Sequence, residues 1–230
     1  MFDTWRLKKN AYSYLSQRQV QLNVDTGAQH TQPLMRGGVQ VMNFEGNPMM
    51  QPYASPVPSR SSSDVYDLFQ NGPVGGSYLF PTGISFNANM AGKGHQLNLG
   101  MSAVGVQTNI RFLPWGPDAC TYMQLDDAAE VWFTGPLSGC NIYSVGNGRQ
   151  IWVIHANFNQ DGDNVQRNNN YKRQVALNVA ASFGPATPLW GHLERGATHY
   201  NGLGFVFGQW KGNRWQNYYH DGQGTVTLLS

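Results

Sequence analysis

The amino-acid sequence predicts an α+β fold: a β-sandwich core of mostly antiparallel strands, flanked by a few helices. Composition is the first observation behind this prediction, since 27 glycines and 12 prolines among 230 residues favour turns and short strands over long helices. Pattern is the second, because β-branched and aromatic residues gather in short runs bounded by Gly, Pro or Asp. Hydrophobic residues make up 40% of the chain, which is enough to build a core.

The expected strands form two groups, with one long helix between them. The first group lies between about 97 and 158 and comprises the runs 107–113, 121–125, 130–134, 140–143 and 150–158. The second group comprises the runs 203–209, 215–219 and 225–229, with Gly-rich turns between them. The excess of strands over helices favours a sandwich or a strongly bent sheet with helices outside.

Two helices are expected. In 171–183 the apolar residues recur at helical spacing, and Gly184 and Pro185 end the pattern. A shorter helix is expected over 64–70, with Ser63 as its N-cap.

We expect one domain over residues 1–230. A Pro- and Ser-rich stretch at 51–63 either separates an N-terminal extension, residues 1–60, from the body or forms a surface loop.

Charge and hydropathy exclude several classes of function. A formal net charge of +2 gives no basic face, so nucleic acid is not an expected partner. No segment approaches the roughly 20 apolar residues of a membrane span. The first residues lack the apolar stretch of a Sec signal peptide, and two cysteines are too few for the disulfide scaffold of a secreted domain. A monomer is expected.

One predicted hairpin, residues 140–155, carries candidate catalytic side chains. Asn147-Gly148 is a strong signal for a two-residue type I′ turn. With that turn, Cys140 lies directly opposite His155, and opposed side chains share a face with Cβ atoms roughly 4.5–5.5 Å apart. Tyr143 and Trp152 are then expected on the other face, packed in the core.

A thiol beside an imidazole is the minimum set for nucleophilic catalysis. The thiolate is the reactive form, and histidine can take up its proton and return it to a leaving amine. Ser138 and Gly139 precede Cys140; a turn of small residues there can direct main-chain N–H groups at an oxyanion and lets a substrate approach.

Two other interpretations of the cysteines stay open. Cys140 and His155 can be ordinary buried strand residues, or Cys140 can form a disulfide with Cys120. Cys120 by itself is expected to be a buried strand residue.

The segment around Cys140 resembles a known family. Leu137-Ser138-Gly139-Cys140, followed by a hairpin and His155, is similar to the Leu-Ser-Gly-Cys motif of the bacterial glutamine-deamidase toxins, which include the Burkholderia lethal factor and the catalytic domain of the cytotoxic necrotizing factors. The wider strings 131–140 and 110–115 are most similar to the lethal factor. The resemblance extends from about residue 110 to about residue 157.

This resemblance implies a β-sandwich flanked by helices and the conversion of one glutamine of a host protein to glutamate. By position, Cys140 corresponds to the nucleophile, His155 to the base and Thr134 to the third element, which acts through its main-chain carbonyl. No metal or other cofactor is implied. Two departures lie beside the site: the stretch between cysteine and histidine is longer than in the lethal factor, and Gly135-Pro136 replaces a pair of aromatic residues.

The expected function is therefore that of a toxin or virulence effector that enters the host cytosol by a non-Sec route. Its expected partner is a host protein, a small GTPase or a translation-initiation helicase, that carries the target glutamine. The same two side chains would also serve a cysteine peptidase or another amidohydrolase. A β-rich binding domain without enzymatic activity is the third hypothesis.

Overall fold

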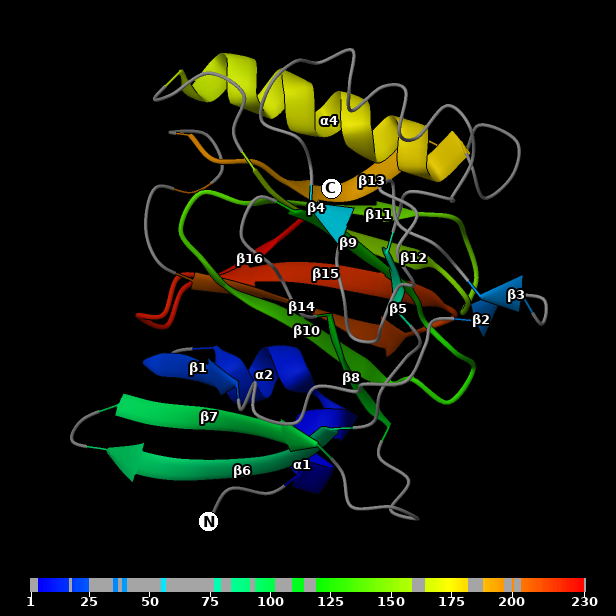
Figure 1. The fold of residues 1–230 in the computed structure, drawn as a ribbon. Helices are drawn as coiled ribbons and strands as arrows, with labels where there is room; N and C mark the ends of the chain where they lie inside the picture. Colours follow the sequence, from blue (N-terminus) through cyan, green and yellow to red (C-terminus); the bar gives the residue numbers. More distant parts are fainter. Residues whose placement is uncertain are drawn as a thin grey trace.

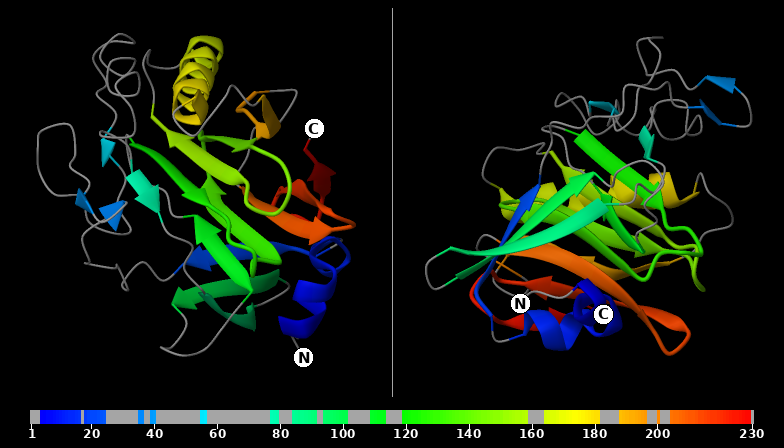
Figure 2. Two further views of the ribbon diagram at one scale, coloured as in Figure 1. Left: turned by 90° about the vertical axis from the view of Figure 1, so that its right-hand side faces the viewer. Right: turned by 90° about the horizontal axis from the view of Figure 1, so that it is seen from below.

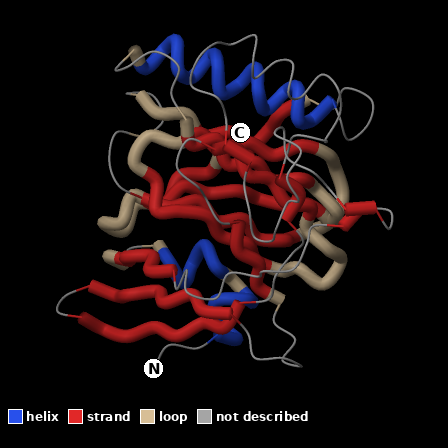
Figure 3. Tube along the Cα trace, viewed as in Figure 1, coloured by secondary structure: helices blue, strands red, loops and turns tan. Residues whose placement is uncertain are grey.

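Strands dominate the computed structural model (Figures 1 and 3). It describes residues 4–16, 18–24, 35–36, 39–40, 55–56, 77–79, 84–91, 94–101, 109–113, 119–158, 164–181, 188–196, 200 and 204–229. The described helices are α1 (Thr4–Lys9), α2 (Ala11–Leu15) and α4 (Val165–Ala181). The described strands are β1 (Val20–Val24), β2 (Met35–Arg36), β3 (Val39–Gln40), β4 (Ser55–Pro56), β5 (Ser77–Leu79), β6 (Ile84–Ala91), β7 (Gly94–Met101), β8 (Ile110–Leu113), β9 (Ala119–Gln124), β10 (Val131–Leu137), β11 (Asn141–Val145), β12 (Trp152–Asn157), β13 (Leu189–Leu193), β14 (Gly204–Lys211), β15 (Arg214–His220) and β16 (Val226–Leu228).

Two sheets form the centre of the molecule. One has the order β13-β11-β12-β9-β4, with β5 also pairing with β9, and the other has the order β16-β15-β14-β10-β8. Most neighbours are antiparallel, although β8 pairs with β10 and β5 with β9 in parallel. The predicted fold class, a mostly antiparallel β-sandwich with few helices, is confirmed.

Helices cover the two outer faces. Helix α4 lies over the sheet that contains β11 and β12, and α1 and α2 lie on the far side of the other sheet, as the views of Figure 2 show. Alternation along each strand sends one set of side chains outward to these helices and the other set inward. The inward set joins the two sheets in one buried cluster, which includes Leu113, Met123, Trp132, Leu137, Cys140, Ile142, Val153, Leu193, Val206, Trp215 and Tyr219.

The N-terminal residues belong to this architecture. Leu7, Ala11 and Leu15 are fully buried and share a cluster with Phe133 and Phe207 of β10 and β14. These three side chains of α1 and α2 therefore contribute to the core. Strand β1 continues into a three-stranded sheet with β7 and β6. Of the stretch 51–63, only β4 is described, and the helix expected over 64–70 lies outside the described residues.

The expected strands and the expected long helix are present, with shifted ends. The long helix begins at Val165, six residues before the expected start, because Asn164 caps it: its Oδ1 accepts from the N–H of Arg167 at 3.0 Å. The first turns are polar and so carry no apolar periodicity. Strand β13, which completes the sheet beside β11, was not expected from the sequence; its short segment alternates weakly, with Leu189 and Trp190 half-buried.

The turn predicted at Asn147-Gly148 is wrong. Val145 pairs with Trp152, so six residues connect β11 to β12, and Asn147 does not adopt the positive φ that a type I′ turn requires. Contacts with other parts of the chain hold this longer loop: the indole of Trp190 donates to the carbonyl of Gly146 at 2.8 Å, and the indole of Trp215 donates to that of Arg149 at 2.8 Å.

Gly208 provides a test of how closely neighbouring side chains of β10, β14 and β15 pack on the inner face of their sheet. A Cβ at this position would overlap the indole Nε1 of Trp132, a fully buried side chain that donates to Asn217 Oδ1. We expect Gly208→Ala to lower the free energy of unfolding by about 3 kcal/mol in urea titrations, since overpacking forces buried side chains off their rotamers. Gly148→Ala is the control: its Cβ would meet nothing, and only the positive φ opposes it, at about 1 kcal/mol. Equal losses for the two variants would contradict this packing.

Candidate active site

The predicted catalytic side chains lie between the two sheets. His155 is on β12, Thr134 is on β10 of the opposite sheet, and Cys140 immediately precedes β11. Thr134 and His155 are fully buried, and Cys140 is 3% exposed. Cys140 belongs to the cluster between the sheets. The neighbours of His155 on the same face of its sheet, Val153 and Ile142, belong to this cluster too.

A hydrogen bond across the sandwich fixes His155. Thr134 Oγ1 lies 2.6 Å from His155 Nδ1 and 2.8 Å from the carbonyl oxygen of Leu113. The hydroxyl has one proton, which it donates to Leu113, because a carbonyl can only accept. We therefore assign the proton of the imidazole to Nδ1, which donates to Thr134, and leave Nε2 with a free lone pair.

The contact made by Thr134 differs from the one that the resemblance implied. The side-chain hydroxyl, not the main-chain carbonyl, orients the imidazole. Thr134 lies inside β10, paired with Leu113 of β8 and Val206 of β14, so its main-chain groups point along the sheet toward those strands. Only the side chain can reach across to the other sheet.

His155 Nε2 is the exceptional polar atom of the described residues. Among their buried side-chain nitrogen and oxygen atoms, it is the one without a hydrogen-bond partner. Buried polar atoms are normally satisfied, and an exception asks for a functional explanation. Burial, together with the positive charge of Lys172, lowers the pKa of His155 from 6.5 to about 3, so the imidazole is neutral and Nε2 is an acceptor at physiological pH.

The register of the hairpin places Cys140 differently from the prediction. His155 lies opposite Ile142, so Cys140 is two positions further along and diagonal to His155. The prediction of direct opposition is wrong, and the longer loop between β11 and β12 is the reason. A shift of two positions keeps both side chains on the same face of the sheet, whereas a shift of one would have separated them.

The Cys140 thiol has polar surroundings despite its burial. Its Sγ donates to Asn157 Oδ1 at 3.2 Å. Burial raises the pKa of the thiol above its ordinary value; the main-chain N–H groups of residues 138–140 and the ammonium of Lys172 act in the opposite direction and lower it. All three N–H groups therefore favour negative charge on the sulfur.

The carbonyls of the same segment are held by other side chains. Lys172 Nζ donates to the carbonyl of Gly139 at 2.6 Å, and the hydroxyl of Tyr200 donates to that of Cys140 at 2.5 Å. Ser138 is exposed and Gly139 is half-buried, so the outer side of this turn is accessible. The carbonyls of Gly139 and Cys140 are therefore bound by side chains, while the N–H groups of the segment lower the pKa of the thiol.

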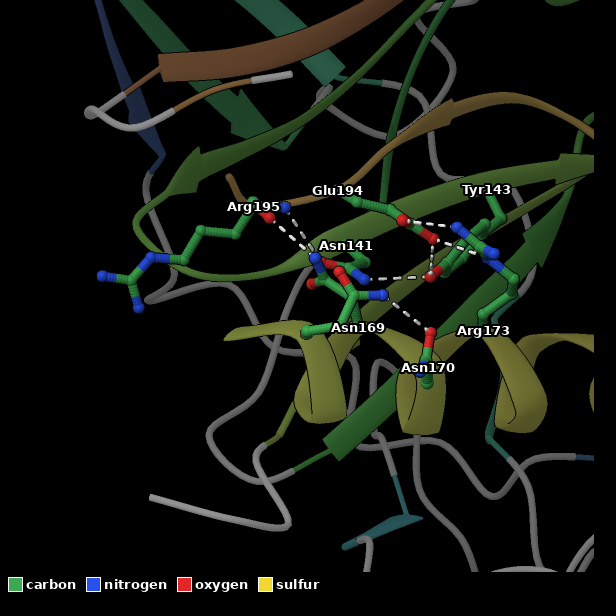
Figure 4. A network of polar contacts seen from close by, with 8 residues as sticks. Asn141, Tyr143, Asn169, Asn170, Arg173, Glu194 and Arg195 are labelled. Carbon is green, nitrogen blue, oxygen red and sulfur yellow. Dashed lines mark hydrogen bonds and ion pairs between the residues drawn. The ribbon is translucent and has the colours of Figure 1, made fainter. Parts of the chain in front are cut away.

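Helix α4 is attached to this region by a polar network (Figure 4). The hydroxyl of Tyr143 accepts from Asn141 at 2.9 Å and donates to Glu194 at 3.0 Å. The guanidinium of Arg173 on α4 binds both oxygens of Glu194, at 2.9 and 2.6 Å. One turn earlier on the helix, Asn169 donates to the carbonyl of Arg195 at 2.7 Å.

The two cysteines lie on opposite faces of their sheet. Cys120 pairs with Ala156, packs in the cluster under α4, and is 1% exposed. Both thiols are free, so the alternative of a Cys120–Cys140 disulfide is wrong. Burial raises the pKa of Cys120 to about 12, and no N–H group or cation opposes this effect. Tyr143 and Trp152 pack in that same cluster, as expected.

Three residues at the site were missed in the sequence. Asn157 follows His155 by two positions, and strand alternation places it on the same face. Lys172 interrupts the apolar stripe of α4 at a position that helical spacing marks as buried. Tyr200 gives no local signal, because only the tertiary fold brings it to Cys140.

A pocket of about 470 Å³ lies away from these residues. It is lined by Gly146, Trp190, Arg214, Trp215, Asn217 and Leu229, at the loop end of the β11–β12 hairpin. Cys140 is at the other end of β11, so this pocket is not part of the candidate site. No three His, Cys, Asp or Glu side chains of the described residues gather in a way that could hold a metal ion, and no described helix could span a membrane.

The buried His155 predicts acid-sensitive stability. Its pKa of about 3 in the folded protein lies below the ordinary 6.5, so its stabilising contribution is complete above pH 6.5 and is lost as the pH falls toward 3. Between pH 7 and pH 4 this loss is about 3 kcal/mol. We expect His155→Gln to lose less free energy of unfolding over this interval than the wild type in urea titrations. Identical pH dependence of the two proteins would contradict a neutral buried imidazole.

Comparison with models of protein families and with curated proteins found no match for the sequence. The geometry of Cys140, His155 and Thr134, together with the local resemblance around Cys140, therefore carries the functional proposal.

Proposed function

We propose that this protein is a cysteine-dependent protein-glutamine deamidase. Cys140 is the nucleophile, His155 the general base and acid, and Thr134 the residue that orients the imidazole. The overall reaction adds water to a glutamine side-chain amide and releases ammonia, which leaves a glutamate. It requires no metal and no other cofactor.

The observation that carries the proposal is the unpartnered Nε2 of His155. Thr134 holds the imidazole by Nδ1, and the free lone pair lies on the sheet face that also carries Cys140. Diagonal neighbours on a sheet are separated by roughly 7–8 Å at the backbone, which is within reach of longer side chains. The proposed reaction requires the Cys140 side chain to rotate away from Asn157, so that its proton is directed toward Nε2.

The first step joins sulfur to the amide carbon. The Cys140 thiol and the His155 imidazole are both uncharged in the resting protein, because burial raises the pKa of the thiol and lowers that of the imidazole. The proton of Cys140 therefore moves to Nε2 as the sulfur attacks. The amide oxygen becomes an oxyanion, and we assign its stabilisation to the N–H groups of residues 138–140, which already favour negative charge on the sulfur.

The second step releases ammonia. The imidazolium returns its proton from Nε2 to the departing nitrogen, and the C–N bond breaks to leave a thioester. Water, deprotonated by His155, then attacks the thioester and regenerates the thiol. Exposed Ser138 and half-buried Gly139 mark the side from which the glutamine reaches Cys140.

The resemblance around Leu137-Ser138-Gly139-Cys140 selects deamidation among the reactions that these groups can perform. It also supports a host protein as substrate, of the small GTPase or translation-initiation helicase class, and a role as a toxin or effector delivered to the host cytosol. The change of the target from a neutral to a negative side chain is then the biological output.

The proposal is tested by incubating a eukaryotic cell extract with wild-type protein or with Cys140→Ser, followed by peptide mass spectrometry. We expect at least one glutamine to become glutamate with the wild type alone, in a polypeptide that stays uncleaved. His155→Ala should behave as Cys140→Ser does, and Cys120→Ser should retain activity. Cleaved peptides would instead indicate a peptidase, and full activity of Cys140→Ser would refute the site.

Thr134→Val tests the orienting hydrogen bond. Valine keeps the shape of threonine but cannot accept from Nδ1, so the imidazole loses its fixed tautomer and orientation. We expect the rate of deamidation to fall at least about tenfold with little change in substrate KM, measured as ammonia release. Thr134→Ser, which retains the hydroxyl, should recover most of the rate. An unchanged rate in folded Thr134→Val would show that the hydroxyl has no part in catalysis.

A further inference from the structure

Lys172 is a buried cation that the catalytic proposal does not use. Only 2% of its surface is exposed, and it projects from α4 toward the turn before Cys140. Burial of an ammonium is unfavourable unless an anion and hydrogen bonds compensate for the lost hydration. Among the described residues, the Lys172 ammonium donates a hydrogen bond to the carbonyl of Gly139, which is neutral and supplies no negative charge.

The carboxylate whose charge raises the pKa of Lys172, that of Glu194, already has a cationic partner. Glu194 forms an ion pair with Arg173 at 2.6 Å and accepts from Tyr143. Among the described residues no carboxylate forms an ion pair with Lys172. The charge of Lys172 is thus left without a fixed counter-ion in the same region as an ionisable thiol.

We propose that Lys172 is a positioning residue for Cys140, and that the negative charge which develops on the Cys140 sulfur during the reaction is the counter-ion that Lys172 lacks in the resting protein. This proposal extends the catalytic role given to Cys140. The ammonium acts in two ways. It binds the carbonyl of Gly139, and because the N–H of Cys140 belongs to the same peptide group, that N–H then points away from the ammonium. It also stabilises negative charge on the sulfur.

The electrostatics of the surrounding groups agree with this role. The charge of Lys172 lowers the pKa of Cys140, and Cys140 in turn raises that of Lys172, which burial brings to about 8. Lys172 also lowers the pKa of His155, which makes the imidazolium a stronger acid toward departing ammonia. The other titratable groups facing this pair are Glu194 and Arg195 after β13, and Tyr200.

The test measures the ionisation of Cys140 without any glutamine substrate. The rate of alkylation by iodoacetamide is followed against pH, with the Cys140 and Cys120 peptides resolved by mass spectrometry. We expect Lys172→Met and Lys172→Gln to raise the apparent pKa of Cys140 by at least about one unit, so that alkylation near pH 7 slows at least about tenfold. Lys172→Arg, which keeps the charge, and Lys211→Met, an exposed lysine, should leave it unchanged.

A merely structural Lys172 would lower the melting temperature of these variants without moving the titration of Cys140. An unchanged pKa in folded Lys172→Met and Lys172→Gln would therefore overturn the proposal. If both variants fail to fold, the reciprocal measurement replaces them: NMR titration of the Lys172 ammonium should give a higher pKa in Cys140→Asp, which places a carboxylate at the position of the sulfur, than in Cys140→Ser, and equal values would reject the pairing.

This experiment and the deamidation assay fail independently. A shift in the Cys140 titration without any modified glutamine would keep the role of Lys172 and reject the reaction. Modified glutamine without a shift in the Cys140 titration would keep the reaction and reject the role of Lys172.

Discussion

The hydrogen bond between Thr134 and His155 is the interaction on which the candidate site depends. It joins the two sheets of the sandwich through a region from which water is excluded, and so it relies on the packing of both. The hydroxyl of Thr134 donates its hydrogen bond to the carbonyl of Leu113, so toward His155 its oxygen can only accept. That single constraint selects the tautomer of His155 and leaves Nε2 as a buried acceptor with nothing bound to it.

A site between packed sheets separates the tasks of its residues. The sheets hold the imidazole rigidly, while the turn at residues 138–140, at the edge of the sandwich, supplies N–H groups and access from solvent. Helix α4, held by the network around Glu194, adds a buried positive charge through Lys172. Burial opposes ionisation of both Cys140 and His155, so the N–H groups and the ammonium are needed to make the thiolate accessible.

Much of this arrangement could be predicted from the sequence, and the errors have physical causes. Strand periodicity predicts the hairpin and the face that carries Cys140 and His155, but the register depends on a loop that contacts with Trp190 and Trp215 hold open. Those contacts come from strands far along the chain, so local turn propensity could not anticipate them. The contacts of Tyr200 with Cys140 and of the Thr134 hydroxyl with His155 also join distant parts of the chain, so local sequence could not predict them either. Lys172 was visible as a charge within an apolar helical stripe, but its target was not.

The protonation of His155 is the most direct measure of this account. The ¹⁵N chemical shifts of its ring nitrogens, recorded on the resting protein near neutral pH, distinguish a protonated from an unprotonated nitrogen. The hydrogen bond to Thr134 predicts a protonated Nδ1, and the lowered pKa predicts an Nε2 that remains unprotonated well below pH 6. A protonated Nε2, or an imidazolium near neutral pH, would contradict this account, since the base that Cys140 needs would then be absent.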